Sequence, residues 1–177
     1  KEIFSYKGNF IDTSYEGEGE YTYYDENNKW THKWIGKFKN SKIVKGKYLR
    51  RDLECNTEYN GEFKGENWKP HGKGIMKYSN PKYKTYLIKK GSFIQEDQSG
   101  KGSYKYFKNK NFTNVTSEYK GDFKDDQKHG FGTFVGITKD KKNKYKYVGN
   151  WKRGETSGKG KEFFPNGDTY VGDFKND

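Results

Sequence analysis

Few side chains in this sequence are placed to do chemistry. His32, His71 and His129 are widely separated, so they do not form the close ligand set that a metal ion needs. His71 and His129 each precede a glycine, and we interpret both as turn residues. Cys55 is the only cysteine, which excludes an internal disulfide and a cysteine-rich zinc site and is compatible with a reducing compartment. We therefore predict that the chain has no metal site.

Pairs of glycines spaced as Gly-x-Gly raise the question of phosphate binding. None of the pairs carries the third glycine of a dinucleotide-binding fingerprint or the Gly-Lys-Ser/Thr of a P-loop, so we expect no nucleotide cofactor. Glu62, Asp122 and Asp173 occupy one recurring position beside lysines, which indicates solvated cross-strand partners and not catalytic acids. No Ser/His/Asp or Cys/His set can be assembled. We predict that this chain has no catalytic residues and is not an enzyme; any catalytic domain of the parent protein would lie elsewhere.

The composition indicates β-strands without a conventional core. Only 29% of the 177 residues are hydrophobic, against roughly 45–50% in most globular domains. The chain nevertheless holds 16 Tyr, 13 Phe and 4 Trp and no alanine, and aromatic residues favour strands. Low hydrophobicity with a net charge of +12 suggests disorder by itself. Each buried ring removes about 150–250 Å² from water, so a repeating set of rings can stabilise a thin structure.

A short pattern recurs along the chain: Tyr-x-Gly-x-Phe or Trp, followed by Gly-x-Gly-x-aromatic. One clear copy runs Tyr119-Lys-Gly121-Asp-Phe123 and then Gly130-Phe-Gly132-Thr-Phe134. Copies begin at residues 6, 34, 59, 89, 119 and 147, with a partial seventh at 170. The second copy keeps only Gly46 of its glycine pair, and the fourth has Lys89 in place of the leading aromatic. Inserted residues between copies predict loops near 25–33, 79–88, 107–118 and 136–146.

The spacing within a copy predicts a β-hairpin whose rings share one face, because side chains alternate along a strand. A turn centred near residues 126–127 predicts three cross-strand pairs: Phe123 with Gly130, Gly121 with Gly132, and Tyr119 with Phe134. We hypothesise that each ring lies across a neighbouring glycine, which gives the ring a flat floor and allows the sheet to bend. Packing of rings on glycine would then substitute for a second layer.

The predicted fold is all-β: one domain over residues 1–177, built as a single-layer, elongated, twisted antiparallel sheet of tandem hairpins. Six hairpins and one further strand give about thirteen strands, and neighbours about 4.8 Å apart make a body roughly 60 Å long. The two terminal strands expose unpaired backbone, so we expect further repeats, another domain or self-association to cover them. The chain lacks an initiator methionine and stops within a motif, and we expect it to be a fragment of a longer protein.

This pattern resembles the MORN (membrane occupation and recognition nexus) repeat, which has the form Tyr-x-Gly-x-Trp/Phe, a short turn, and Gly-x-Gly-x-Tyr-x-Tyr. The resemblance extends over nearly the whole chain. It implies a binding scaffold in which a groove holds an extended or helical segment of a partner protein. It also implies a possible contact with phosphoinositides, because the family occurs beside lipid kinases and at membrane junctions.

The first candidate surface is an aromatic groove. A one-layer sheet leaves some rings uncovered, and contiguous exposed apolar surface usually marks a binding site. The alternative interpretation is that the rings only pack on one another. The residues predicted to line the groove are Tyr21, Tyr23, Tyr48, Tyr78, Tyr104, Tyr106, Phe134 and Phe164.

The second candidate surface is a basic rim formed by the loops, if these emerge along one edge. Such a rim would bind anionic lipid with about 1 kcal/mol per lysine, although a merely solvated loop face is the simpler interpretation. With only 3 Arg in the chain, a bidentate phosphate site is disfavoured. The predicted rim comprises Lys82, Lys84, Lys108, Lys110, Lys139, Lys141, Lys142, Lys144 and Lys146.

These patterns predict a protein partner, with anionic membrane lipid as the alternative and no nucleic-acid partner. No run approaches the roughly 18 apolar residues that span a bilayer, and no signal-peptide core is visible. We therefore expect an intracellular, cytoplasmic protein that acts at a cytoskeletal or membrane-associated assembly.

Overall fold

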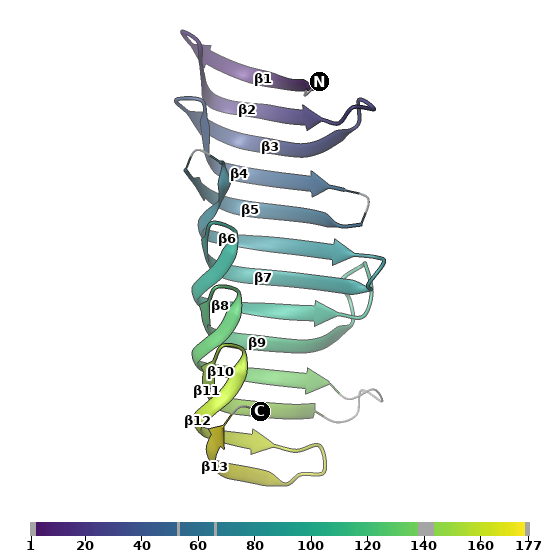
Figure 1. The fold of residues 1–177 in the computed structure, drawn as a ribbon, viewed down its shortest axis with the longest axis vertical. Coiled ribbons are helices and arrows are strands. Elements are labelled where there is room, and N and C mark those ends of the chain that lie inside the picture. Colours follow the sequence, from purple (N-terminus) through teal and green to yellow (C-terminus); the bar gives the residue numbers. More distant parts are fainter. Residues whose placement is uncertain (1–2, 53, 66, 138–143, 176–177) are drawn as a thin grey trace.

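The computed structural model describes residues 3–52, 54–65, 67–137 and 144–175. Thirteen strands form one antiparallel sheet in which each strand pairs with the next in sequence, so β1 and β13 lie at opposite ends (Figure 1). The strands are β1 (Ile3–Ile11), β2 (Ser14–Tyr24), β3 (Trp30–Lys39), β4 (Lys42–Arg51), β5 (Asn56–Lys64), β6 (Lys69–Asn80), β7 (Thr85–Ile94), β8 (Asp97–Phe107), β9 (Val115–Lys124), β10 (Gln127–Ile137), β11 (Lys144–Lys152), β12 (Glu155–Phe163) and β13 (Thr169–Lys175).

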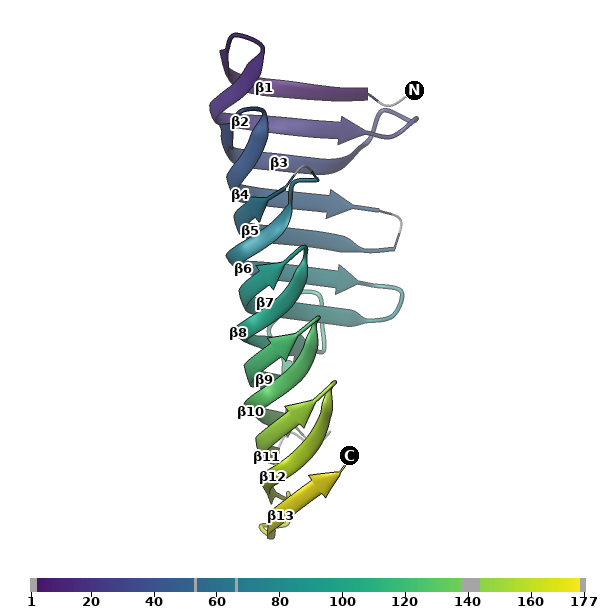
Figure 2. The same cartoon turned by 60° about the vertical axis from the view of Figure 1, so that its left-hand side comes forward.

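The sheet is a single layer, as predicted, and it is strongly bent. The strands curve along their length, so that the sheet has a concave inner face and a convex outer face (Figure 2). No helix occurs among the described residues, and hence none that could cross a membrane. The all-β, single-layer prediction is therefore confirmed.

A continuous line of glycines crosses the whole sheet, one from each strand, and we call it the glycine ladder. A Cβ on Gly121 would lie 2.5 Å from the Gly132 Cα and 2.6 Å from the Phe131 carbonyl oxygen. The backbones therefore approach too closely for any larger residue, and the sheet is free to bend along this line. The ladder pairs Gly8, Gly19, Gly36, Gly46, Gly61, Gly74, Gly91, Gly102, Gly121, Gly132, Gly149, Gly160 and Gly172 in order.

The leading tyrosines lie on this ladder, which confirms the ring-on-glycine hypothesis for them. In the second copy, which begins with Trp34, no ring atom is among the nearest neighbours of a Cβ on Gly36 or Gly46. The ring of Tyr119 covers both Gly121 and Gly132. Its hydroxyl donates a hydrogen bond to the Asp122 carbonyl at 2.9 Å, and this bond holds the ring flat against the backbone. The same arrangement of ring, glycine and carbonyl recurs at Tyr6, Tyr59, Tyr147 and Tyr170.

Rings from successive hairpins hold the repeats to one another. The Tyr119 ring meets the edge of Phe123 of its own hairpin at 5.0 Å and that of Trp151 of the next hairpin at 5.4 Å, measured between centroids. Such edge-to-face pairs stabilise beyond the area that they bury. Backbone bonds reinforce the joint, because the Gly154 amide donates to the Lys128 carbonyl at 3.0 Å. Each repeat is therefore fixed mainly by its neighbours in sequence.

The fourth repeat, which lacks the leading aromatic, has a polar replacement. Gln98 is fully buried, and its Nε2 covers Gly102 as the tyrosine ring does elsewhere. This amide donates to the carbonyls of Lys90 at 2.9 Å and Ser103 at 3.1 Å. Lys89 instead forms an ion pair with Asp126 at 2.6 Å.

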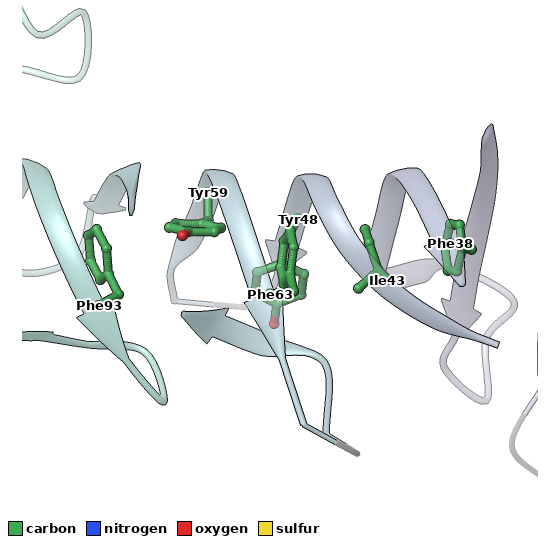
Figure 3. Packing of buried hydrophobic residues seen from close by; sticks show 6 residues of the cluster. All are labelled: Phe38, Ile43, Tyr48, Tyr59, Phe63 and Phe93. Carbon is green, nitrogen blue, oxygen red and sulfur yellow. The ribbon is translucent and has the colours of Figure 1, made fainter. Parts of the chain in front are cut away.

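This polar joint divides the apolar core in two. The first cluster contains Phe38, Ile43, Tyr48, Tyr59, Phe63 and Phe93, spread over successive hairpins (Figure 3). The second contains Tyr119, Phe123, Tyr147, Trp151 and Phe174. Between them, the leading position is occupied by Lys89 and offers no ring to bridge the clusters.

The predicted hairpin register is only partly correct. Gly121 pairs with Gly132 and Tyr119 with Phe134, as expected, but Phe123 pairs with Lys128 and not with Gly130. The turn lies at residues 125–126, which both have positive φ, and a bulge at Gly130, with φ of +59°, adds unpaired residues to β10. A bulge of this kind re-registers the strand while it keeps the rings on one face.

The carboxylates at the fourth position of the pattern accept hydrogen bonds from backbone amides at these bulges. Asp122 accepts a hydrogen bond from the Phe131 amide at 3.2 Å, and Glu62 accepts one from the Lys73 amide at 3.0 Å. The predicted pairing with lysine is also present, because Asp122 contacts Lys101 at 2.8 Å. Their role is structural, at the surface of the hairpin.

The loops between hairpins are shorter than predicted. They occupy residues 25–29, 81–84 and 108–114 in place of the predicted 25–33, 79–88 and 107–118. The flanking residues pair instead, as Thr85 does with Asn80 and Val115 with Phe107. Likewise β10 extends to Ile137 and β11 begins at Lys144, inside the predicted loop 136–146.

Candidate functional site

The predicted groove residues lie on the inner face of the sheet in two neighbouring rows. In the first row, Tyr21, Tyr48, Tyr104 and Phe134 stand opposite the leading positions of the adjoining strands. Tyr23, Tyr78 and Tyr106 lie two residues further along the same or equivalent strands, and Phe164 directly follows β12. The structure therefore brings these rings to one face, which we call the trough.

The two rows differ in how far their rings are covered. Tyr48 is only 8% exposed, and burial raises its pKa to about 12. Burial also raises the pKa of Tyr104 to about 12. By contrast, Tyr106 is 37% and Phe164 is 38% exposed. The first row belongs largely to the core, and the second row supplies the accessible aromatic surface.

Trp68 covers the trough near its N-terminal end, which sequence reasoning did not foresee. It lies in the turn between β5 and β6 with φ of +52°. Its ring meets those of Tyr21 at 4.7 Å, Trp34 at 5.3 Å and Phe38 at 5.8 Å. The signal is a longer turn, because Gly72 follows Phe63 by nine positions where the fifth copy has seven. This part of the trough is therefore filled by the chain itself.

Lys128 is a second inner-face residue that the sequence pattern did not reveal. Its ammonium lies 3.7 Å from the centroid of the Trp151 ring and 5.0 Å from that of Phe134. Burial lowers the pKa of Lys128 to about 8. Other repeats have an uncharged residue at this position, two before the first glycine: Tyr15, Pro70, Gln98 and Thr156.

The histidines and the cysteine have local structural roles. His71 and His129 lie in β6 and β10 and not in turns, so that part of the prediction is wrong. The bulge beside each one lengthens the strand past the expected turn. Cys55 donates its thiol to Asp52 at 3.1 Å within a loop. Across the described ranges, no group of three or more His, Cys, Asp or Glu side chains is arranged to hold a metal ion.

The loops between hairpins emerge along one edge of the sheet, opposite the tight turns (Figure 1). Not every predicted rim lysine is free at this edge. Lys82 forms an ion pair with Glu54, and the Lys146 ammonium lies 5.3 Å from the Phe163 ring. All six described rim lysines are exposed, namely Lys82, Lys84, Lys108, Lys110, Lys144 and Lys146, whereas Lys139, Lys141 and Lys142 lie outside the described residues.

An open single-layer sheet of tandem hairpins, with tyrosine on a glycine ladder, defines a β-hairpin repeat protein. The MORN repeat family model matches the chain at residues 6–27, 69–80, 119–141 and 147–169, which is consistent with a MORN repeat protein. The copies beginning at Trp34 and Lys89, which depart from the pattern, fall outside the matched segments. No curated protein was found to match the chain. MORN repeats are generally associated with protein or membrane binding.

Proposed function

We propose that this chain is a non-enzymatic scaffold that holds a segment of a partner protein in the trough. The observation that carries this proposal is the exposure of Tyr106 and Phe164 on the concave face of a sheet that has no second layer. Large rings exposed on a concave surface lose contact with water when a ligand covers them, which favours binding. Such a scaffold would act at a cytoskeletal or membrane-associated assembly.

The accessible part of the trough lies C-terminal to the third hairpin. Trp68 already packs on Tyr21 near the N-terminal end. Further along, the ring centroids of the half-buried Tyr104 and of Tyr106 lie 5.2 Å apart. The centroid of Tyr145 lies within 6.4 Å of those of Phe134 and Phe164. A partner segment in extended or helical form would lie along these rings.

Site-specific crosslinking tests this proposal. A photoreactive phenylalanine analogue replaces Tyr106 in one variant and Phe131, which is 58% exposed on the outer face, in another. We expect the variant at position 106 to crosslink to a partner protein in extracts of the source cells. We expect this crosslink to disappear in the Phe164→Ala variant. Equal yields of the same crosslinked partner from positions 106 and 131 would contradict binding in the trough.

The second candidate function is binding to anionic phospholipid. It is favoured by the placement of Lys84, Lys108, Lys110 and Lys144 in or beside loops that leave one edge of the sheet. Cosedimentation with phosphatidylserine or phosphoinositide vesicles tests it across a salt series. Binding through the lysines would weaken steeply as salt screens the charges. Binding that persists at high salt, or that survives replacement of all four lysines by glutamine, would contradict this function.

A further inference from the structure

Two lysines of the central repeats point into the trough, and only one of them has a carboxylate partner. Lys89 lies 2.6 Å from Asp126 with its side chain 16% exposed. Lys128 is the other, and within the described part of the chain no carboxylate lies at ion-pair distance from its ammonium. The two rings described above are its close neighbours.

This unpaired ammonium is not needed by the fold. A partly buried ammonium loses hydration, and ring faces compensate for only part of that loss. At the equivalent position of the fourth repeat, the uncharged Gln98 is fully buried and donates to two backbone carbonyls. Pro70 occupies the same position in the third repeat. The fold therefore accepts an uncharged residue here, and the charge of Lys128 is left available for a ligand.

We infer that Lys128 is the anchor for a carboxylate of the bound partner segment. The occupant of the trough is then an acidic protein segment whose Asp or Glu side chain pairs with the Lys128 ammonium. Its apolar side chains lie against Phe134 and Tyr106. This inference rests on the proposed function, and it names the chemical class of the partner.

Charge and shape both favour this occupant. The chain carries a net charge of +12, so an acidic segment is attracted to the protein before it makes contact. An ammonium between ring faces suits a single carboxylate, because lysine lacks the planar fork with which arginine grips phosphate. A flat membrane contacts the loop edge more readily than a residue within a concave face. A carboxylate-bearing peptide therefore fits better than a lipid headgroup.

Two fluorescent synthetic peptides of equal length test the inference. In the first peptide phenylalanine and leucine alternate with glutamate, and in the second every glutamate is replaced by glutamine. At physiological ionic strength we expect the wild-type chain to bind the glutamate peptide about tenfold more tightly, as fluorescence anisotropy measures it. Lys128→Met should lose most of this preference and keep only the part that comes from the overall charge. Lys124→Met removes the same charge from an exposed site of the same hairpin and should keep the wild-type preference.

The outcomes separate this inference from the function on which it rests. If Lys128→Met prefers the glutamate peptide as strongly as the wild type does, the preference comes from overall charge and the inference is wrong. If the wild type binds both peptides equally and Tyr106→Ala weakens both, the trough binds apolar segments and only the role of Lys128 is wrong. If neither peptide binds, the inference and the proposed function both fail.

Discussion

Tyr119 and Gly132 lie on adjacent strands, and the tyrosine ring occupies the space that a β-carbon on Gly132 would need. The three atoms nearest to such a carbon all belong to Tyr119. In most sheets a second layer covers the aromatic face. Here the aromatic side chain lies on bare backbone and its hydroxyl bonds to the Asp122 carbonyl at 2.9 Å. The glycine and the tyrosine therefore act together as one structural unit.

Gly132→Ala should destabilise the chain by about 2 kcal/mol, because the added methyl group overpacks the site under the Tyr119 ring. The midpoint of urea unfolding measures the change. Gly136→Ala is the matched control on the same strand, where a Cβ would make an ordinary contact of 3.4 Å with Phe134. We expect that control to change stability by no more than about 0.5 kcal/mol. Equal losses in the two variants would refute the steric explanation.

Tyr119→Phe should lower the free energy of unfolding by about 1 kcal/mol, since it removes the hydroxyl that bonds to the Asp122 carbonyl at a partly buried site. Tyr170→Phe removes the equivalent bond of 3.5 Å from a ring that is 46% exposed. There water replaces the hydroxyl, so the loss should be smaller. Chemical denaturation of the two variants in parallel distinguishes these cases, and a larger loss for Tyr170→Phe would contradict the account.

The regular repeats were predictable from the sequence because one physical rule governs each copy. The alternation of Tyr119, Gly121 and Phe123 predicts a shared face, and their recurrence predicts the sheet. The bulge at Gly130 was not predictable in the same way. A glycine allows positive φ but does not show on which strand the extra residue lies.

The exceptions were harder to predict because they depend on residues distant in sequence. Lys89 marks the irregular fourth copy, but its compensation comes from Gln98 and from Asp126 of the next hairpin. Trp68 enters the trough from a longer turn, and only the fold shows that this turn reaches the second hairpin. In the sequence Lys128 looks like any solvated lysine, and only the fold shows that its ammonium lies over the Trp151 ring. Such contacts between repeats leave no periodic signal.

Asp126→Asn should destabilise the polar joint by about 1 kcal/mol, because it removes the negative charge that neutralises Lys89. Asparagine tolerates the φ of +62° at this turn position, and its Oδ1 can still accept the hydrogen bond from the backbone N–H of Gln98. Asp125→Asn changes the same charge at the preceding, exposed turn position and should have little effect. Thermal unfolding at low and at high salt measures both. An Asp125→Asn loss as large as that of Asp126→Asn would show that the turn, and not the ion pair, determines the result.

The stability of the chain should rise with pH above about 8 because of Lys128. Its pKa falls from an ordinary value of 10.5 to about 8 on folding, so between these values the unfolded chain binds a proton that the folded chain does not. The free energy of unfolding therefore increases with pH across this window. Lys128→Met should be more stable than the wild type at pH 7 and should lose this part of the pH dependence. The control Lys124→Met should retain it.

Urea unfolding at a series of pH values from neutral to about 10 measures this slope. The comparison stops there because tyrosines begin to ionise near pH 10 in the unfolded chain. A Lys128→Met profile parallel to that of the wild type would show that the ammonium is not buried between the rings.

The most direct test of ring-on-glycine packing is a double-mutant cycle between Tyr119 and Gly132. It compares the free energies of unfolding of the wild type, Gly132→Ala, Tyr119→Ala and the double variant. We expect Gly132→Ala to be much less costly once the ring is gone, with a coupling energy of about 1 kcal/mol or more. If Gly132→Ala costs the same in both backgrounds, the ring does not depend on the bare backbone beneath it, and the explanation of this single-layer sheet is wrong.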